Sequence, residues 1–269
     1  MSTIALLAVY VLVIGSMSAA ISYGIMRWSY SLKRHAKLAE RFNGMTVVTL
    51  NAGILLALGL AFIFNDISAV RARAKTSVLQ EADAIRTLGR MSLNIDPTVG
   101  APLMAATRQY TKDVLQKEWS AMRRDTSEDI RSGVSSALAP LTVMSDIVYS
   151  VENIAKLPTV TSMHLANLVT RIREQRLQRI DASSFSMGLR GYMLVAVTLL
   201  ATATLFSLSL LSKPAAQFIS NFFLFFVIVL TSYLAFVSQN PFYGLDAITP
   251  LPLQEAFDRL NAMTLTRAK

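Results

Sequence analysis

The chain has 269 residues, of which 53% are hydrophobic and only 16% are charged, and its mean hydropathy of +0.44 is too apolar for a soluble domain of this length. The absence of cysteine excludes disulfides and thiolate metal sites, and two histidines offer little for zinc or redox chemistry. The formal net charge of +9 admits nucleic acid, anionic lipid or a permeating anion, but the usual Lys/Arg bias of cytoplasmic loops explains it most simply. We therefore expect an integral membrane protein that binds no nucleic acid.

Two uncharged stretches near the N-terminus predict a transmembrane hairpin in residues 1–64. Residues 4–26 contain no charged side chain, and at about 1.5 Å per helical residue they exceed the roughly 30 Å hydrocarbon core. A cleaved signal peptide is the alternative, but no basic residue precedes this apolar run. Residues 45–64 form the second span, with Asn51 as their only strongly polar side chain.

Residues 65–190 form a polar domain whose apolar residues recur at helical spacing. Its first helix is expected to continue from the second span out of the membrane into the aqueous phase. The helical spacing of apolar residues is interrupted between Asn94 and Gly100. Three further helices are expected, one of them disturbed at Pro140. The four stripes are Ile67, Val70, Ala74, Val78, Ile85 and Leu88; Leu103, Tyr110, Val114 and Trp119; Ile130, Val134, Leu138 and Leu141; and Met163, Leu168, Val169, Ile172 and Ile180. Because no alternating strand pattern is present, we expect an all-α fold.

The second transmembrane hairpin follows in residues 191–237. It consists of the spans 191–211 and 215–237, and the short polar segment between them, which includes Pro214, leaves room only for a tight reversal. Residues 238–269 are a polar C-terminal tail with one amphipathic helix. The expected architecture is an all-α integral membrane protein with four transmembrane helices in two hairpins and an intervening helical polar domain.

The basic residues near the spans bear on the orientation of the chain. The side of the membrane that holds the polar domain carries more of them than the opposite side, which favours a cytoplasmic polar domain. The residues counted for that side are Arg71, Arg73, Lys75, Arg171, Arg173, Arg176, Arg179 and Arg190, with Arg259 in the tail.

No catalytic constellation is recognisable in the sequence. Ser/His/Asp sets, glycine-rich phosphate loops and metal-ligand spacings are absent, and His35 and His164 lie in unrelated segments. We therefore expect neither an enzyme nor a site for a cofactor or a metal.

The second span carries the most informative pattern for function. Ile54, Leu58 and Phe62 lie four residues apart and therefore along one face of a helix. In a ring of such helices they would form an apolar constriction that gates ions by dewetting, and Asn51 could offer amide hydrogens to an anion that loses its water. Apolar residues at this spacing more often face lipid or a neighbouring helix, so both interpretations stay open.

Several local matches resemble the bacterial bestrophin-like membrane proteins. The segment 236–253, FVSQNPFYGLDAITPLPL, is similar to the family's pattern of a span that ends in an acid or amide, then Pro-Phe, a nearby Gly and Pro-x-Pro-Leu. Asn240 stands there in place of the expected Asp, and the usual Pro-aromatic entrance to the third span is absent. The other matches are Glu81-Ala82, Tyr110, Glu118-Trp119 with Met122, and Arg173 to Leu177.

The resemblance implies a bestrophin-like fold and a location in a bacterial inner membrane. Bestrophins proper are pentameric, anion-selective channels whose second helix lines a hydrophobic neck, and Ile54, Leu58 and Phe62 resemble that neck. The resemblance thus implies a homopentamer that passes small anions such as chloride. No acidic calcium clasp like that of animal bestrophins is present, so calcium gating is not expected. The alternative is a non-conducting membrane scaffold or sensor whose polar domain binds a cytoplasmic partner. Its mark would be an exposed apolar patch on the polar domain that includes Tyr110 and Trp119, but we expect both aromatic side chains to be buried.

Overall fold

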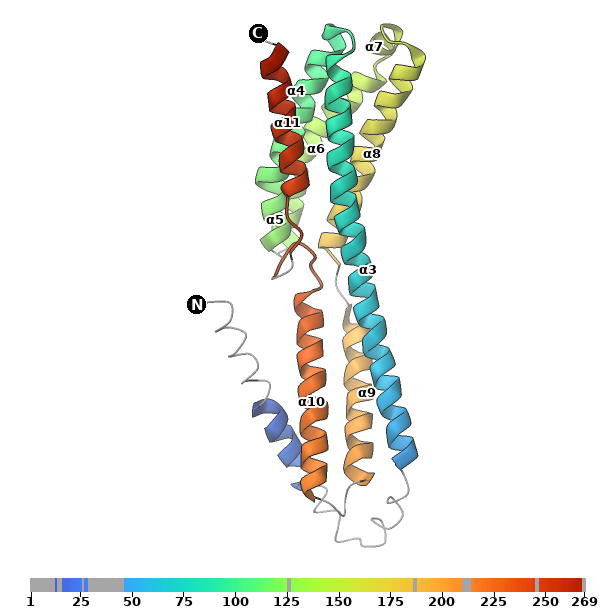
Figure 1. Cartoon of the computed structure of the whole chain (residues 1–269), viewed down its shortest axis with the longest axis vertical. Helices are drawn as coiled ribbons and strands as arrows, with labels where there is room; N and C mark the ends of the chain where they lie inside the picture. The colour runs from blue at the N-terminus through green and yellow to red at the C-terminus, as the bar shows by residue number, and fades with distance from the viewer. Residues whose placement is uncertain are drawn as a thin grey trace. The chain divides into compact units, whose positions relative to one another are not determined.

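The structure is a computed structural model that describes residues 13, 16–25, 27–28, 46–124, 127–185, 188–209, 214–244 and 247–267. Within these ranges no residue is in a strand, and the expectation of an all-α fold is confirmed. The helices labelled in Figure 1 are α3 (Thr46–Leu93), α4 (Pro97–Asp113), α5 (Trp119–Arg124), α6 (Ser127–Tyr149), α7 (Val151–Ala155), α8 (Thr159–Ser183), α9 (Gly188–Ser209), α10 (Pro214–Val237) and α11 (Leu251–Arg267). A π-helical turn, η1 (Val114–Glu118), joins α4 to α5.

The chain divides into two compact units. The first unit combines Met1–Ile67 with Met187–Gln239, and the second combines Ser68–Ser186 with Asn240–Lys269. The division falls within α3, so this one helix contributes residues to both units. The predicted boundaries at residues 64, 190 and 237 separate transmembrane hairpins from polar segments, and they stay a prediction.

Two stretches of the described helices are long and apolar enough to cross a membrane. They are Asn51–Leu93 of α3 and Ala215–Ala235 of α10, whose most apolar windows are only 17% and 22% buried within the chain. Helices that are this apolar and this little covered need lipid or another chain around them. The apolar segment Ala196–Leu205 of α9 is shorter than these two stretches. Part of the predicted first span, residues 4–26, lies outside the described residues.

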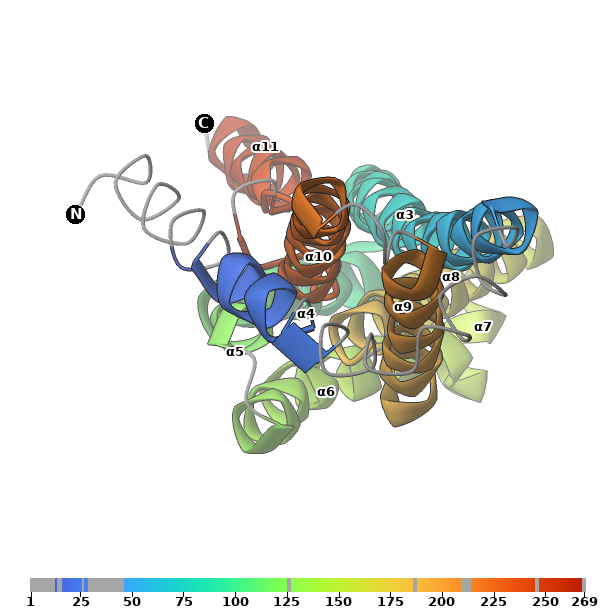
Figure 2. The same ribbon diagram turned by 90° about the horizontal axis from the view of Figure 1, so that it is seen from below.

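The helices of the first unit pack through small and polar side chains. Thr202 and Ala203 of α9 are buried, and the Thr202 hydroxyl, which donates to the Thr198 carbonyl at 2.7 Å, lies 3.4 Å from the Ala52 carbonyl of α3. α9 also packs on α10, and Figure 2 views these helices from below. The buried face of α10 is formed by Gln217, Asn221, Phe225 and Ile228. This packing covers one side of each helix and leaves the rest of its apolar surface outward.

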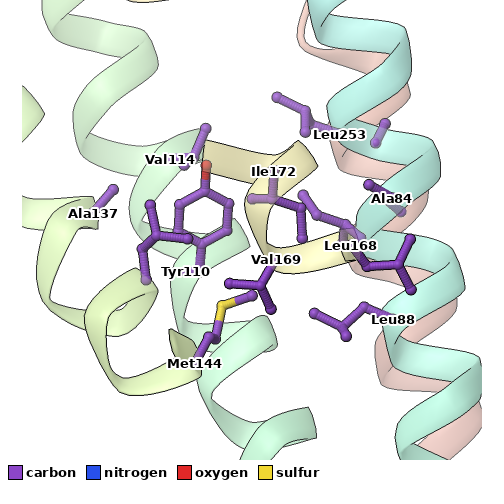
Figure 3. Close-up of a cluster of buried hydrophobic side chains, with 14 of the residues drawn as sticks. Ala84, Leu88, Tyr110, Val114, Ala137, Met144, Leu168, Val169, Ile172 and Leu253 are labelled. Carbon is purple, nitrogen blue, oxygen red and sulfur yellow. The ribbon is translucent and has the colours of Figure 1, made fainter. Parts of the chain in front are cut away.

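The core of the second unit lies among α3, α4, α6, α8 and α11. The predicted stripe of α3 is buried from Ile67 to Leu88, as expected. Figure 3 shows the side chains of Leu88, Tyr110, Met144 and Ile172 converging from α3, α4, α6 and α8. α11 adds Leu253, Ala256 and Leu260 to the same cluster. The tail helix is therefore part of this core.

Two residues predicted to face the core are exposed instead. Leu138 of α6 and Met163 of α8 point outward, because the buried face of each helix runs through neighbouring positions, Leu141 in α6 and Leu165 in α8. α6 also continues through Pro140, where the sequence predicted a disturbance.

The turn between α3 and α4 is tightly built. Asp96 caps α4 by accepting a hydrogen bond from the Thr98 backbone N–H at 2.8 Å, and Pro97 is the first helical residue. The predicted interruption between Asn94 and Gly100 is thus confirmed, since α3 ends at Leu93. Gly100 is buried, and a Cβ atom at this position would collide with the backbone carbonyl of Ser92.

Gly100→Ala should destabilise the protein by about 1–3 kcal/mol, because a backbone carbonyl cannot move aside as the end of a side chain can. Gly24→Ala is the matched control, since nothing lies within 4 Å of its added Cβ. Thermal unfolding of both purified variants in the same detergent measures the difference. Equal midpoints for the two variants would contradict this account of the turn.

Candidate functional site

The exposed face of α3 in the first unit holds the four residues predicted to line a pore. Ile54, Leu58 and Phe62 are 51%, 50% and 68% exposed, and Asn51 is exposed at the start of the same face. Leu56, on the opposite side of the helix, is buried. α3 therefore packs against its own chain on one side and presents this apolar row on the other, where lipid or another copy of the chain could meet it.

A group of buried charged side chains lies in the second unit, where α3, α4, η1 and α8 meet. Arg179 of α8 donates from Nε to Oε2 of Glu81 at 2.8 Å and from Nη2 to Oε1 of Glu81 at 3.2 Å. The same Nη2 donates to Oε1 of Glu118 at 2.6 Å. The Tyr110 hydroxyl donates to Oε1 of Glu81 at 2.6 Å. Arg179 thus joins the carboxylates of two helical segments that are far apart in sequence.

Arg176, one turn before Arg179 on α8, completes the group. Its Nε and Nη2 donate to Oε2 of Glu118 at 3.0 and 2.8 Å. Residues three apart on a helix lie on the same face, so both arginines reach the same carboxylate. We call Glu81, Tyr110, Glu118, Arg176 and Arg179 the buried charge cluster. Two carboxylates and two guanidinium groups give it a formal charge of zero.

All five side chains of the buried charge cluster are removed from solvent. Burial acts to lower the pKa of Arg179, but the charges of Glu81 and Glu118 outweigh burial and raise this pKa above its ordinary value. Burial, together with the charge of Glu81, raises the pKa of Tyr110 well above its ordinary value. Neither Arg179 nor Tyr110 changes its protonation near neutral pH, so both act as fixed hydrogen-bond donors.

Aromatic and amide side chains close the buried charge cluster on one side. The Arg179 Cζ lies 5.8 Å from the centroid of the Trp119 ring, which meets Phe242 edge to face at 5.2 Å. Asn240 donates from Nδ2 to the Met122 carbonyl at 3.0 Å, and its Oδ1 accepts from the Phe242 backbone N–H at 2.9 Å. These contacts attach residues 240–242 to α5.

The π-helical turn η1 explains how two adjacent residues both face inward. The Trp119 backbone N–H bonds to the Val114 carbonyl, five residues earlier, and both side chains are buried. The extra residue in this turn lets Glu118 point into the buried charge cluster while Trp119 packs beside it. The five-residue spacing between Val114 and Trp119 was visible in the predicted stripe.

A family model described as the bestrophin-like domain matches residues 17–253. The chain belongs to the bestrophin-like family. The expectation drawn from local matches is therefore confirmed, and the structure brings the matched residues Glu81, Tyr110, Glu118 and Asn240 into one region.

Solved structures of a bacterial bestrophin homologue from Klebsiella pneumoniae have the same fold as this bestrophin-like chain. A structure phased on zinc gives a TM-score of 0.67 at 15% identity, covering 94% of this chain and 98% of that chain. Two mutants of the homologue give TM-scores of 0.68 at 14% identity and 0.64 at 16% identity, covering 94% and 95% of this chain and 98% of theirs. No curated protein matches the chain. With its little-covered apolar helices, this member of the family is a membrane protein.

Sequence reasoning found most residues of the buried charge cluster but not their contacts. Arg179 lay outside the matched segments, and it was counted with Arg176 among the charges that orient the chain in the membrane. Both arginines are buried in ion pairs, and the cytoplasmic orientation of the polar domain stays a prediction. The signal that could have found them is a spacing of three and four residues along α8, which continues the core stripe through Leu165, Leu168, Ile172, Arg176 and Arg179.

Tyr110→Phe should cost about 1.5–3 kcal/mol near neutral pH, because it removes a hydrogen bond to a charged carboxylate. The pKa of Tyr110 is higher in the folded than in the unfolded protein, so its contribution is complete below about pH 10 and is lost as the pH rises further. The difference in unfolding midpoint between wild type and variant should therefore stay constant from about pH 7 to 9 and shrink above about pH 10.

Tryptophan fluorescence in a Trp28→Phe background follows this unfolding, since Trp119 then remains as the single reporter. A difference that persists or grows at high pH would contradict the role assigned to the Tyr110 hydroxyl.

Asn240→Asp restores the residue that the family pattern favours and should destabilise this chain. The Met122 carbonyl loses its donor, and a buried carboxylate is introduced beside it, at a cost of about 1–3 kcal/mol or more. Only a protonated Asp could donate to that carbonyl, so the loss should shrink as the pH falls. Asn167→Asp, at an exposed position of α8, is the control for thermal unfolding at pH 5 and pH 8. A variant as stable as this control at pH 8 would show that the amide is not needed.

Proposed function

We propose that this bestrophin-like chain forms a homo-oligomeric membrane channel, a pentamer by family resemblance, that passes small anions such as chloride. The observation that carries the proposal is the exposed row of Ile54, Leu58 and Phe62 on α3. The row lies on the helix that lines the pore of bestrophins proper, and the chain leaves it uncovered. Apolar side chains at a subunit interface or around a pore axis would account for that exposure.

The proposed topology has four transmembrane helices in two hairpins, residues 1–64 and 191–237. α10 has the length and apolarity of a span, and the 22 residues of α9 reach about 33 Å, enough for the hydrocarbon core. The 3.4 Å contact between the Thr202 hydroxyl and the Ala52 carbonyl supports the arrangement of α9 beside the proposed pore helix. The N-terminal helix, described in part, supplies the remaining span.

The proposed pore works through dehydration. Rings of Ile54, Leu58 and Phe62 would stack about 6 Å apart along the axis and open or close to water with small changes of diameter. Asn51, at one end of the row, would offer amide hydrogens to an anion that loses part of its hydration shell. Past the other end of the row, α3 carries Arg71, Arg73 and Lys75 within five residues, which raises the local concentration of anions.

Oligomerisation is part of the proposal. Four apolar helices with few polar groups at membrane depth provide no water-filled path within one subunit, so conduction needs an axis shared by several copies. A stable monomer in a mild detergent would count against the channel.

A second candidate function is a non-conducting scaffold or sensor. The expected burial of Tyr110 and Trp119 is confirmed, so neither side chain offers a docking surface. Other apolar side chains of the second unit support the idea, since Val151 of α7 is 83% exposed and Val160 and Met163 of α8 are 81% and 63% exposed. A cytoplasmic partner that binds these residues would favour this function.

Leu58→Ala and Phe62→Ala should each raise single-channel conductance, because truncation widens the apolar constriction. The measurement is single-channel recording of the purified protein in planar bilayers under asymmetric chloride, where wild type should reverse near the chloride equilibrium potential. Leu60→Ala is the matched control, since residue 60 lies two positions from Leu58 and faces away from the row.

Unchanged conductance in both variants would remove these residues from the pore. If folded, inserted wild-type protein passes no current at any voltage, the result would favour the scaffold instead.

A further inference from the structure

A cavity of about 560 Å³ lies in the second unit between α3 and α8. Both helices can be followed in Figure 1. Its volume falls in the range of sites for small ligands, roughly 300–1,000 Å³. The cavity is lined by Val70, Arg73, Gln178, Asp181, Ala182 and Phe185.

Two opposite charges face this cavity without neutralising each other. Among the residues that the structure describes, neither Arg73 nor Asp181 takes part in an ion pair, and both are exposed. Arg73 uses Nε for a long hydrogen bond of 3.4 Å to the Ala69 carbonyl, so its two terminal nitrogens remain available to a ligand. In contrast, Arg176 and Arg179 on the same helix as Asp181 are consumed by the buried charge cluster.

Along α3 the cavity lies just past the uncharged residues 45–64, so a membrane crossed by these residues would have its surface near the cavity. Asp66 is the first charged residue after the apolar stretch of this helix, and Arg73 follows it after two turns, about 10 Å further on. Phe185 lies just before the apolar helix α9 in the chain. A lipid headgroup would meet the cavity at this depth, and a water-soluble ligand could reach it as well.

We propose that this cavity binds a phosphoethanolamine group, the zwitterionic headgroup of an ethanolamine phospholipid. Arg73 would hold the phosphate with its planar fork, which matches the geometry of phosphate oxygens. Asp181 would accept hydrogen bonds from the ammonium group, and the negative end of the α8 dipole, next to Asp181, would favour the same cation. Val70 and Phe185 offer an apolar wall to the glycerol and the first methylenes of the lipid.

The same geometry discriminates between headgroups. A choline headgroup carries a quaternary ammonium without N–H groups and cannot donate a hydrogen bond to Asp181. A phosphoglycerol headgroup has hydroxyl donors but no cation, so the Asp181 carboxylate would lie beside an anionic lipid without an ion-pair partner. The proposal does not depend on conduction, because it requires only that α3 crosses the membrane.

The test is binding of lipids to the full-length protein after delipidation in detergent, measured by native mass spectrometry and by the shift of the thermal unfolding midpoint. The probes are matched phosphatidylethanolamine, phosphatidylcholine and phosphatidylglycerol, with water-soluble phosphoethanolamine as a fourth arm. Wild type should bind phosphatidylethanolamine about tenfold more tightly than the other two lipids. Binding of free phosphoethanolamine alone would assign the cavity to a soluble ligand and overturn the lipid assignment.

Asp181→Asn should abolish the preference for phosphatidylethanolamine, because Asp181 is the group that distinguishes the headgroups. Arg73→Gln should instead weaken the binding of all three lipids by about tenfold, since each of them carries a phosphate. Arg90→Gln on α3 and Glu174→Gln on α8 are the matched controls, since both side chains are exposed and neither lines the cavity. Controls that bind lipids as wild type does, with an Asp181 variant that folds but loses the preference, would support the site. Equal binding of the three lipids by wild type, an unchanged preference in the Asp181 variant, or wild-type affinities in the Arg73 variant would overturn it.

Discussion

The second unit buries the guanidinium groups of Arg176 and Arg179, and its helices must therefore bring ion-pair partners to them. A buried charge costs several kcal/mol unless a partner and further hydrogen bonds compensate it. α8 can therefore dock only where Glu81 from α3 and Glu118 from η1 arrive together at Arg179. Apolar packing alone would tolerate a shift of one helix along another, whereas these hydrogen bonds define a single register.

The π-helical turn and the buried charge cluster depend on each other. In an uninterrupted α-helix Trp119, five residues after Val114, would lie about 140° around the helix from it and away from the face that Val114 buries. The wider turn η1 brings both Glu118 and Trp119 toward Arg179, one as an ion-pair partner and the other as an aromatic surface. The π-helical turn thus allows the contacts of Glu118 and Trp119 with Arg179. Such turns often occur at functional sites.

Helices and boundaries were largely predictable from the sequence, because they depend on local patterns. The stripe from Ile67 to Leu88 and the interruption near Pro97 are examples. The exposed row of α3 was also recognisable from spacing alone, although its function was not. The contacts of the buried charge cluster were beyond such reasoning, since Glu81 and Arg179 lie 98 residues apart and only the folded chain brings them together. An arginine near a span is normally interpreted as a surface charge, so the buried ion pairs of Arg176 and Arg179 were not predicted.

The discontinuity of the second unit in the chain has a consequence for biosynthesis. Its core needs Phe242, Leu253 and Leu260, which follow α10 in the chain and are synthesised after it. Residues 68–186 therefore emerge, together with their uncovered apolar surface, before α10 and the segment that completes their core. The second unit can complete its folding only after α10 has been synthesised, so a nascent chain arrested within α10 would present incomplete core surface to chaperones and proteases.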